Sequence, residues 1–140
     1  MDLYKVNLKG VVSWSFEFEN QDWFAGYRDL ATHGVGKPVL NIFRMYGLMQ
    51  GARVHAGTQD GFNAKKIIEQ GVRNGNDINA LASSADRSVW IMVWNYHDDN
   101  QKGGNATVEL DIKNLATKKV LVHHYRVDHQ YSNSFEKWKS

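Results

Sequence analysis

Residues 88–94 limit most strongly what this chain can fold into. The run places apolar side chains alternately on the two sides of an extended strand, namely Val89, Ile91 and Val93 on one side and Trp90, Met92 and Trp94 on the other. A strand that is apolar on both faces must be covered on both faces, as is typical of a central strand. The sequence therefore predicts a sheet with residues 88–94 in its middle.

Other stretches also have β character. Residues 106–113 alternate apolar with polar side chains, which predicts a half-exposed strand paired as a hairpin with the preceding one across the polar loop 97–105. Residues 120–127 predict a further strand, and residues 78–83 a short one. The second part of the chain is therefore expected to be rich in antiparallel sheet.

The first part of the chain has a different pattern. Residues 11–18 predict a strand, and residues 34–38 (GVGKP) predict a helix start with proline in its first turn. An amphipathic helix follows, which Gly51 is expected to end. Its apolar positions are Val39, Ile42, Phe43, Tyr46 and Met49. A strand, a loop and an amphipathic helix form one β/α unit, which cannot bury its strand alone.

Weaker signals complete the domain organisation. Residues 63–72 have a weak helical pattern, and Phe135 and Trp138 are spaced as on one helical turn. Residues 52–61 are polar and contain glycine, which favours a boundary there. The expected domains are residues 1–51 and a β-rich domain over residues 52–140.

Composition excludes several classes of protein. The 42% apolar and 23% charged residues are typical of a globular chain. The net charge of +2 is well mixed, so no nucleic-acid partner is expected. The chain has no cysteine and no apolar run near the roughly 20 residues of a membrane span, and residues 1–7 lack a signal-peptide core. A soluble protein of the cytoplasm or periplasm, without membrane partners, is expected.

Residues 14–24 combine aromatic rings with carboxylates, as a sugar site does. Trp14, Trp23 and Phe24 offer flat faces for the C–H groups of a pyranose. Glu17 and Glu19 lie two apart on the expected strand, so both leave one face and suit hydroxyl binding better than a catalytic pair flanking a bond. Solvated strand-end charges explain the two carboxylates equally well, and packing in a core is the more common role of such aromatic residues.

No cofactor is expected. Residues 97–100 (HDDN) resemble a metal loop only loosely, because Lys102 occupies the place of a third oxygen ligand. His123 and His124 point to opposite faces of a strand, and His129 adds no third ligand. The sequence also lacks a phosphate-binding glycine loop and a nucleophile elbow.

Several motifs, in order, resemble glycoside hydrolase family 39, the β-xylosidases. They are SWSFEFE at residues 13–19, FAGYRDL at 24–30, GKPVLN at 36–41, VWNYHDD at 93–99, HYRVD at 124–128 and YSNS at 131–134. The resemblance covers nearly the whole chain. It implies the last β/α unit of a (β/α)8 TIM barrel, with strand 8 and helix 8, followed by a partial antiparallel β-sandwich domain that is incomplete at its C-terminus.

The resemblance also implies a function. Members of the family hydrolyse xylosides with retention and without a cofactor, and their substrate partners are small carbohydrates. Their acid/base glutamate stands beside an asparagine and their nucleophile precedes a tryptophan, and neither motif occurs here. We therefore expect the C-terminal portion of a β-xylosidase-like enzyme that is inactive by itself, with no catalytic residue assigned.

Three residues are expected by resemblance to contact substrate. Trp14 matches the tryptophan that forms the floor under the sugar, and the Trp14–Ser15 bond matches a non-proline cis peptide. Glu19, and secondly Glu17, match acidic residues that bind hydroxyls.

Two alternatives remain: a non-catalytic β-rich carbohydrate-binding or interaction module, and a truncated reading frame without independent function. The sequence does not indicate an oligomeric state.

Overall fold

The computed structural model describes residues 22–25, 29–99 and 103–140. The chain divides into two compact units. Unit 1 consists of Met1–Lys5 and Gln50–His123, and unit 2 consists of Val6–Met49 and His124–Ser140. The C-terminal residues thus join the first part of the chain, an association that the boundary expected after residue 51 did not include.

A short hairpin precedes the first helix of unit 2. Strand β1 (Ala31–Thr32) pairs antiparallel with β2 (Val35–Gly36). The two residues between them, His33 and Gly34, have φ values of 45° and 78°. Positive φ at both positions is what a two-residue type I′ turn requires. Gly34 therefore belongs to a hairpin turn, not to the helix start that the sequence predicted for residues 34–38.

Helix α1 (Pro38–Leu48) confirms the predicted helix. Pro38 lies in the first turn, where its missing N–H would have no partner inside the helix. The expected apolar stripe is present but is not buried, because Val39, Phe43 and Tyr46 are 44–48% exposed. Packing within unit 2 therefore covers only part of this stripe.

Residues 124–140 are tied to this helix and hairpin by two long-range hydrogen bonds. Asn41 Nδ2 donates to the carbonyl of Ser132 at 3.1 Å, and Ser134 Oγ donates to the carbonyl of Gly36 at 2.8 Å. Helix α3 (Ser134–Lys139) follows, confirming the helical turn predicted from Phe135 and Trp138. These bonds hold the C-terminal segment against α1.

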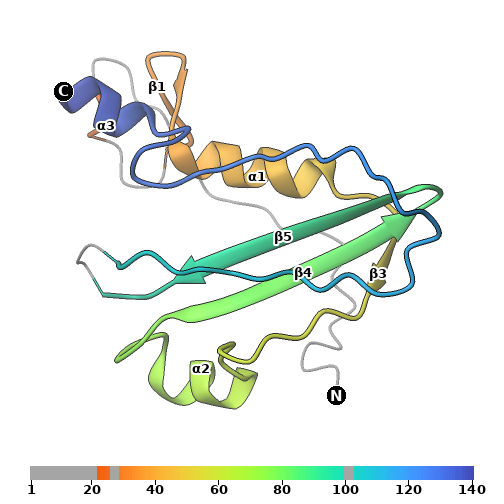
Figure 1. The fold of residues 1–140 in the computed structure, drawn as a ribbon. Helices are drawn as coiled ribbons and strands as arrows, with labels where there is room; N and C mark the ends of the chain where they lie inside the picture. The colour runs from red at the N-terminus through yellow and green to blue at the C-terminus, as the bar shows by residue number, and fades with distance from the viewer. Residues whose placement is uncertain (1–21, 26–28, 100–102) are drawn as a thin grey trace. The chain divides into compact units, whose positions relative to one another are not determined.

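Unit 1 is built on a three-stranded antiparallel sheet in the order β3–β4–β5 (Figure 1). Its strands are β3 (Ala52–Val54), β4 (Asp77–Ala85) and β5 (Ser88–Tyr96). The predicted strands over residues 78–83 and 88–94 are confirmed. The central position expected for residues 88–94 is wrong, because β4 lies between β3 and β5. Apolar side chains on both faces of a strand indicate that its faces avoid water. They do not indicate that both of its edges are hydrogen-bonded to neighbouring strands.

The core of unit 1 is small. Its buried apolar residues among those described are Val72, Ala82 and Met92. Helix α2 (Ala64–Gln70) confirms the helix predicted for residues 63–72, and Asn63 caps it by accepting a hydrogen bond from the N–H of Lys66 at 2.9 Å. Polar contacts between the loops and the sheet add to this limited apolar core.

Two predicted strands do not form. Residues 103–133 contain no helix or strand, so the predictions of strands at 106–113 and 120–127, and of a hairpin joining the first to residues 88–94, are wrong. The alternating apolar side chains are nevertheless present and exposed, with Leu121 at 83% and Val122 at 74%. A strand requires hydrogen bonds to a neighbouring strand, and the alternation of side chains within one segment does not show whether such a neighbour is present.

The predicted architecture is therefore corrected. The described residues form three helices and two separate antiparallel sheets, a mixed α+β arrangement. Every strand pair among them is antiparallel, whereas a (β/α)8 barrel needs parallel strands. A β-sandwich needs two sheets packed face to face, whereas the described residues of the predicted domain 52–140 contain one three-stranded sheet. The prediction of a TIM-barrel unit followed by a partial β-sandwich is therefore wrong.

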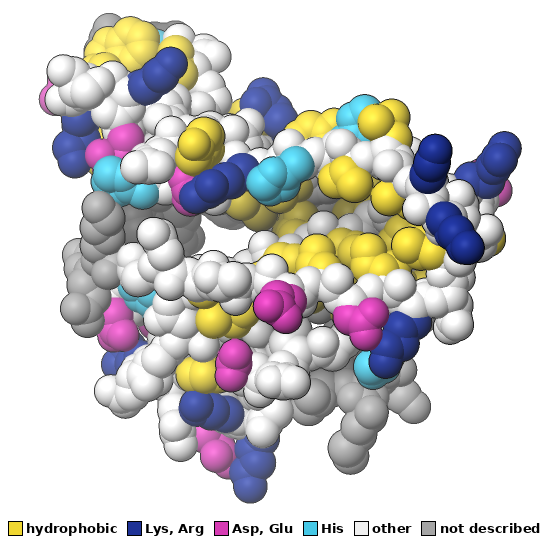
Figure 2. Space-filling model, viewed as in Figure 1, with side chains coloured by type: hydrophobic (Ala, Val, Ile, Leu, Met, Phe, Trp, Pro, Cys, Tyr) yellow, Lys and Arg dark blue, Asp and Glu magenta, His cyan; other side chains and the backbone are white. Residues whose placement is uncertain are grey.

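Exposed apolar side chains are common in the described part of the chain. Figure 2 shows several of them on one face, between Lys, Arg, Asp and Glu side chains. Ile68, on α2, is 82% exposed. Among the described residues no helix has the length and apolar character needed to cross a membrane.

Candidate functional site

The residues expected to bind sugar lie outside the described part of the chain. Trp14, Glu17 and Glu19 are in residues 1–21, as is the Trp14–Ser15 bond expected to be cis. The sugar site predicted from residues 14–19 therefore remains a prediction.

Trp23 and Phe24, the two other candidate stacking residues, are described and differ from each other. The Trp23 ring packs on His33 with centroids 4.5 Å apart and is 45% exposed. Phe24 packs against Phe135 and Trp138, with centroid distances of 5.4 and 5.2 Å. Packing in an aromatic cluster accounts for Phe24, whereas Trp23 retains an exposed ring.

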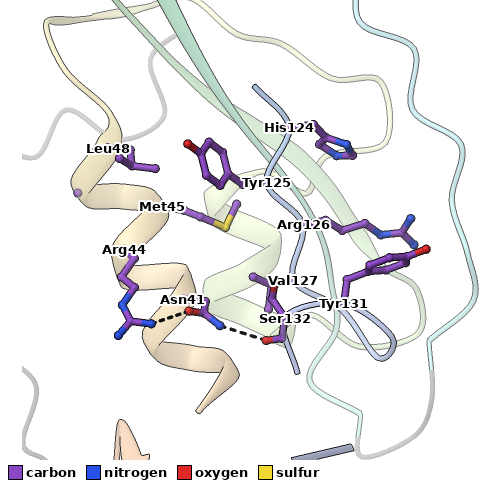
Figure 3. Close-up of a pocket in the computed structure, with 11 residues that line it drawn as sticks. Asn41, Arg44, Met45, Leu48, His124, Tyr125, Arg126, Val127, Tyr131 and Ser132 are labelled. Carbon is purple, nitrogen blue, oxygen red and sulfur yellow. Dashed lines mark hydrogen bonds between the residues drawn. The ribbon is translucent and has the colours of Figure 1, made fainter. Parts of the chain in front are cut away.

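A cavity of about 940 Å³ lies in unit 2, between α1 and the segment that follows residue 123 (Figure 3). The described residues that line it come from α1 and from two parts of the C-terminal segment. They are Asn41, Arg44, Met45, Gly47, Leu48, His124, Tyr125, Arg126, Val127, Tyr131 and Ser132. None of these is a carboxylate, so this lining offers binding groups and no acid/nucleophile pair.

Along the C-terminal wall of this cavity, successive side chains point to opposite sides, as they do in any extended chain. In Figure 3, Tyr125 and Val127 lie on the side of α1, near Met45, whereas His124 and Arg126 point to the other side. The wall therefore presents apolar and aromatic surface toward the helix and polar groups toward the other side of the segment.

Asn41 connects the two walls. Its Nδ2 donates to the carbonyl of Ser132 at 3.1 Å, and its Oδ1 accepts from Arg44 Nη1 at 2.9 Å (Figure 3). Both groups of the amide are therefore used, one across the cavity and one along α1. The arrangement orients the Arg44 guanidinium on the helix wall.

Arg126 is held from two directions. Its guanidinium lies over the Tyr131 ring, 4.5 Å from the centroid, and its Nε donates to Asp128. Asp128 in turn accepts hydrogen bonds from the backbone N–H groups of Gln130 and Tyr131, at 2.8 and 2.9 Å. The turn at residues 128–131 thus fixes the arginine and the ring together.

The Asp128 carboxylate is stabilised in its charged form. Partial desolvation raises the pKa of Asp128, but the hydrogen bonds from Tyr131, Gln130 and Arg126 outweigh it and hold the pKa below its ordinary value. Asp128 is therefore ionised at neutral pH, and its ion pair with Arg126 persists there.

Two carboxylates of unit 1, Asp77 and Asp98, accept hydrogen bonds from both backbone and side-chain donors. Asp77 is buried and accepts hydrogen bonds from Phe62 N at 2.7 Å and Trp94 Nε1 at 2.8 Å. Asp98 accepts from Val72 N at 2.6 Å and from Tyr96 Oη at 2.8 Å. Each one joins a loop to the sheet.

The contacts of Asp98 also shift two pKa values. The hydrogen bond from Val72 N is the main cause that lowers the pKa of Asp98 below its ordinary value. The hydrogen bond to Asp98 is the main cause that raises the pKa of Tyr96. The carboxylate and the phenol are therefore held as a charged acceptor and a neutral donor, which suits a structural link.

Two of the histidines considered in the sequence, His124 and His129, have surroundings that the structure describes. His124 lines the cavity of unit 2, and His123 belongs to unit 1. His129 Nε2 lies 3.5 Å from Glu136 Oε2 on α3. No group of three metal-ligating side chains occurs among the described residues.

Comparison of the chain with models of known protein families, with curated proteins and with solved structures finds no match. The resemblance to family 39 therefore rests on the motifs in the sequence alone.

Sequence reasoning missed the cavity as a site. Arg126, Tyr131 and Asn41 belong to motifs of the sequence, but no binding role was predicted for any of them. A local signal existed in the sequence: an aspartate two residues after an arginine and three before a tyrosine is able to form the turn that brings these side chains together. The wall contributed by α1 had no local signal, because Asn41 and Ser132 are 91 residues apart.

Proposed function

We propose that this chain is the C-terminal portion of a β-xylosidase-like glycoside hydrolase that acts on xylosides and xylo-oligosaccharides with a retaining mechanism. The observation that carries the proposal is the set of six motifs that resemble family 39 in the same order along the chain. Isolated short motifs recur by chance, but an ordered set across nearly the whole chain is more specific.

In this proposal the chain supplies one wall of the sugar site. Trp14 forms the floor beneath the pyranose through contacts of its indole with ring C–H groups. Glu19, and secondly Glu17, accept hydrogen bonds from sugar hydroxyls, because an ionised carboxylate has acceptor sites only. The reaction itself depends on an acid/base and a nucleophile that these residues do not replace.

The chain alone is proposed to be catalytically inactive. Retaining hydrolysis needs two carboxyl groups about 5–5.5 Å apart on either side of the scissile bond. Glu17 and Glu19 are expected on one face of one strand, which places them on one side of the sugar. The described lining of the unit 2 cavity contains no carboxylate that would complete such a pair.

Exposed apolar side chains support a role as part of a larger protein. Ile68 and Leu121 are more than 80% exposed, and Val122 is 74% exposed. Solvent contact of such side chains costs free energy that burial against further protein recovers, at roughly 25 cal/mol per Å² of apolar surface.

The proposal is tested by assaying the purified chain on an aryl β-xyloside. We expect no release of the aryl group above that of a Glu17→Gln/Glu19→Gln double variant, because neither glutamate acts as acid/base or nucleophile. Turnover by the unaltered chain that the double variant lacks would overturn the proposal.

The alternative is a non-catalytic carbohydrate-binding module. The observation that favours it is the cavity of unit 2, with Tyr125 and Tyr131 exposed in its wall. Such a module binds neutral xylo-oligosaccharides measurably by itself, whereas a single wall of a larger site does not. Titration calorimetry with neutral xylotetraose separates the two functions.

A further inference from the structure

Strand β5 is an edge strand with one open side. In the sheet order β3–β4–β5 its backbone pairs with β4 on one side (Figure 1). No described residue forms a backbone hydrogen bond with its other side. The N–H and C=O groups on that side are therefore available to a further strand.

The turn between β4 and β5 decides which residues present these groups. Asp86 and Arg87 connect the paired residues Ala85 and Ser88. In a turn of this length the first and fourth residues are hydrogen-bonded to each other. Because hydrogen-bonded and non-hydrogen-bonded pairs alternate along an antiparallel ladder, the even-numbered residues of β5 bond to β4. The groups on the open side belong to the odd-numbered residues, namely Val89, Ile91, Val93 and Asn95.

The open side of β5 lacks the features that usually keep an edge strand from pairing with another chain. Such edges carry charged side chains, prolines or bulges. Residues 88–96 contain no charged residue and no proline, and their pairing with β4 is continuous. The edge is also exposed at its two ends, with Val89 at 42% and Tyr96 at 52%. It is therefore an unprotected template for strand pairing.

The opposite edge of the same sheet is protected. It is formed by β3, which has only three residues and carries an exposed arginine, Arg53, in its middle. A short strand with a charged residue is a poor template for further pairing. Pairing of copies through β5 therefore closes after two copies and does not continue into a fibre.

The sequence of β5 is complementary to itself in one antiparallel register. A two-fold axis at Met92 places Ile91 opposite Val93 of the second copy. The same register places Trp90 opposite Trp94 of the second copy. Ile91 and Val93 then form hydrogen-bonded pairs, as their groups on the open side require, whereas the two Met92 residues form a non-hydrogen-bonded pair. Aliphatic and aromatic cross-strand pairs both stabilise a sheet, and no like charges meet in this register.

We propose that a second copy of this chain binds to the open side of β5, so that the two three-stranded sheets join into one antiparallel sheet across a two-fold axis at Met92. Backbone hydrogen bonds hold the strands together, and the side-chain pairs fix the register, as in other cases of strand addition. The proposal concerns unit 1 alone and does not depend on the proposed hydrolase activity.

The first test uses single cysteines, because the chain itself contains none. In Met92→Cys the two thiols face each other in a non-hydrogen-bonded pair, where side chains are closest. In Val89→Cys the two thiols lie about 20 Å apart, because Val89 is opposite Asn95 of the second copy. Mild oxidation should give a covalent dimer at least about tenfold faster in Met92→Cys, since its thiols react as neighbours within a formed dimer. Exposure alone predicts the reverse order, because Val89 is 42% and Met92 only 7% exposed.

The second test is sedimentation velocity of the whole chain over a range of concentrations. The unaltered chain is expected to change from monomer to dimer as its concentration rises. Val89→Lys/Asn95→Lys places like charges opposite each other at both ends of the interface and should weaken the dimer about tenfold. Val89→Glu/Asn95→Lys places opposite charges there and should restore it. Val54→Lys/Gln70→Lys, which adds the same charge on β3 and α2, is the matched control and should leave the dimer unchanged.

Several results would overturn the proposal. They are a monomer at every concentration, aggregates without a discrete dimer, and cross-linking of Met92→Cys no faster than that of Val89→Cys. A two-lysine variant of β5 that weakens the dimer no more than the control, or a Val89→Glu/Asn95→Lys variant that stays monomeric, would contradict the register. Circular dichroism checks the fold of each variant, and each test decides alone should a variant of the other unfold. None of these results bears on the xyloside assay, so the two proposals fail separately.

Discussion

An Asp77→Ala variant is expected to lose about 2–4 kcal/mol of unfolding free energy. Asp77 is only 5% exposed, and its carboxylate accepts from Phe62 N at 2.7 Å, from Trp94 Nε1 at 2.8 Å and from Asn79 Nδ2 at 3.4 Å. Removing the acceptor leaves partly buried donors without partners, at about 1–3 kcal/mol each. The loss is large beside the 5–15 kcal/mol that is usual for small proteins.

The measurement is urea unfolding followed by circular dichroism. Asp111→Ala is the matched control, because the Asp111 side chain is 79% exposed and meets Lys113 only at 3.6 Å. It is expected to change stability by less than about 0.5 kcal/mol. Asp77→Asn, which retains one acceptor oxygen, should fall between the two. Equal midpoints for Asp77→Ala and Asp111→Ala would show that Asp77 does not hold the loop at Phe62.

A Gly51→Ala variant is also expected to be destabilised by about 2–4 kcal/mol. Gly51 has a φ of +79°, a conformation that costs a residue with a Cβ about 1–3 kcal/mol. A Cβ at this position would also overlap the backbone carbonyl of Ser84, which pairs with Ala52 at the start of β3. The substitution therefore strains the chain where β3 meets β4.

Gly47→Ala is the matched control for this variant, and its expected sign is opposite. Gly47 lies inside α1, and a Cβ there meets nothing within 4 Å. Alanine in place of an exposed helical glycine should stabilise by about 0.5–1 kcal/mol. Urea unfolding of both variants checks the pair. A shift of the same sign for both would contradict the account of Gly51.

The elements that formed as predicted carry local signals. Pro38 and the apolar spacing after it mark α1, and the continuous apolar run at residues 88–94 marks β5. The step from elements to architecture failed. The pattern of residues 88–94 predicted a strand, but it did not show which strands pair with its edges.

The hairpin at residues 31–36 had no clear signal. Its turn places His33 at φ 45°, a position usually taken by asparagine, aspartate or glycine, and each strand has two residues. Because Gly34 and Gly36 stand just before Pro38, they suggested a helix start instead. The conformation was decided by pairing across the turn, which a residue-by-residue pattern does not contain.

Residues 106–113 and 120–127 show the opposite failure. Their alternation is strong, yet neither range forms a strand. A strand forms only when it is hydrogen-bonded to a neighbour, so the alternation of apolar and polar side chains is not sufficient to predict one.

For the site, the sequence placed the sugar-binding residues at 14–19, outside the described residues. The cavity of unit 2 depends on contacts between α1 and residues 124–132 that only the fold supplies.

The central claim, that this chain is part of a β-xylosidase-like enzyme, is tested most directly by the nucleotide sequence upstream of the Met1 codon. The account predicts an uninterrupted reading frame that encodes a glutamate beside an asparagine and, later, a glutamate followed by tryptophan, in the family 39 order. A stop codon in that frame before either motif, or a frame that encodes neither, would contradict it.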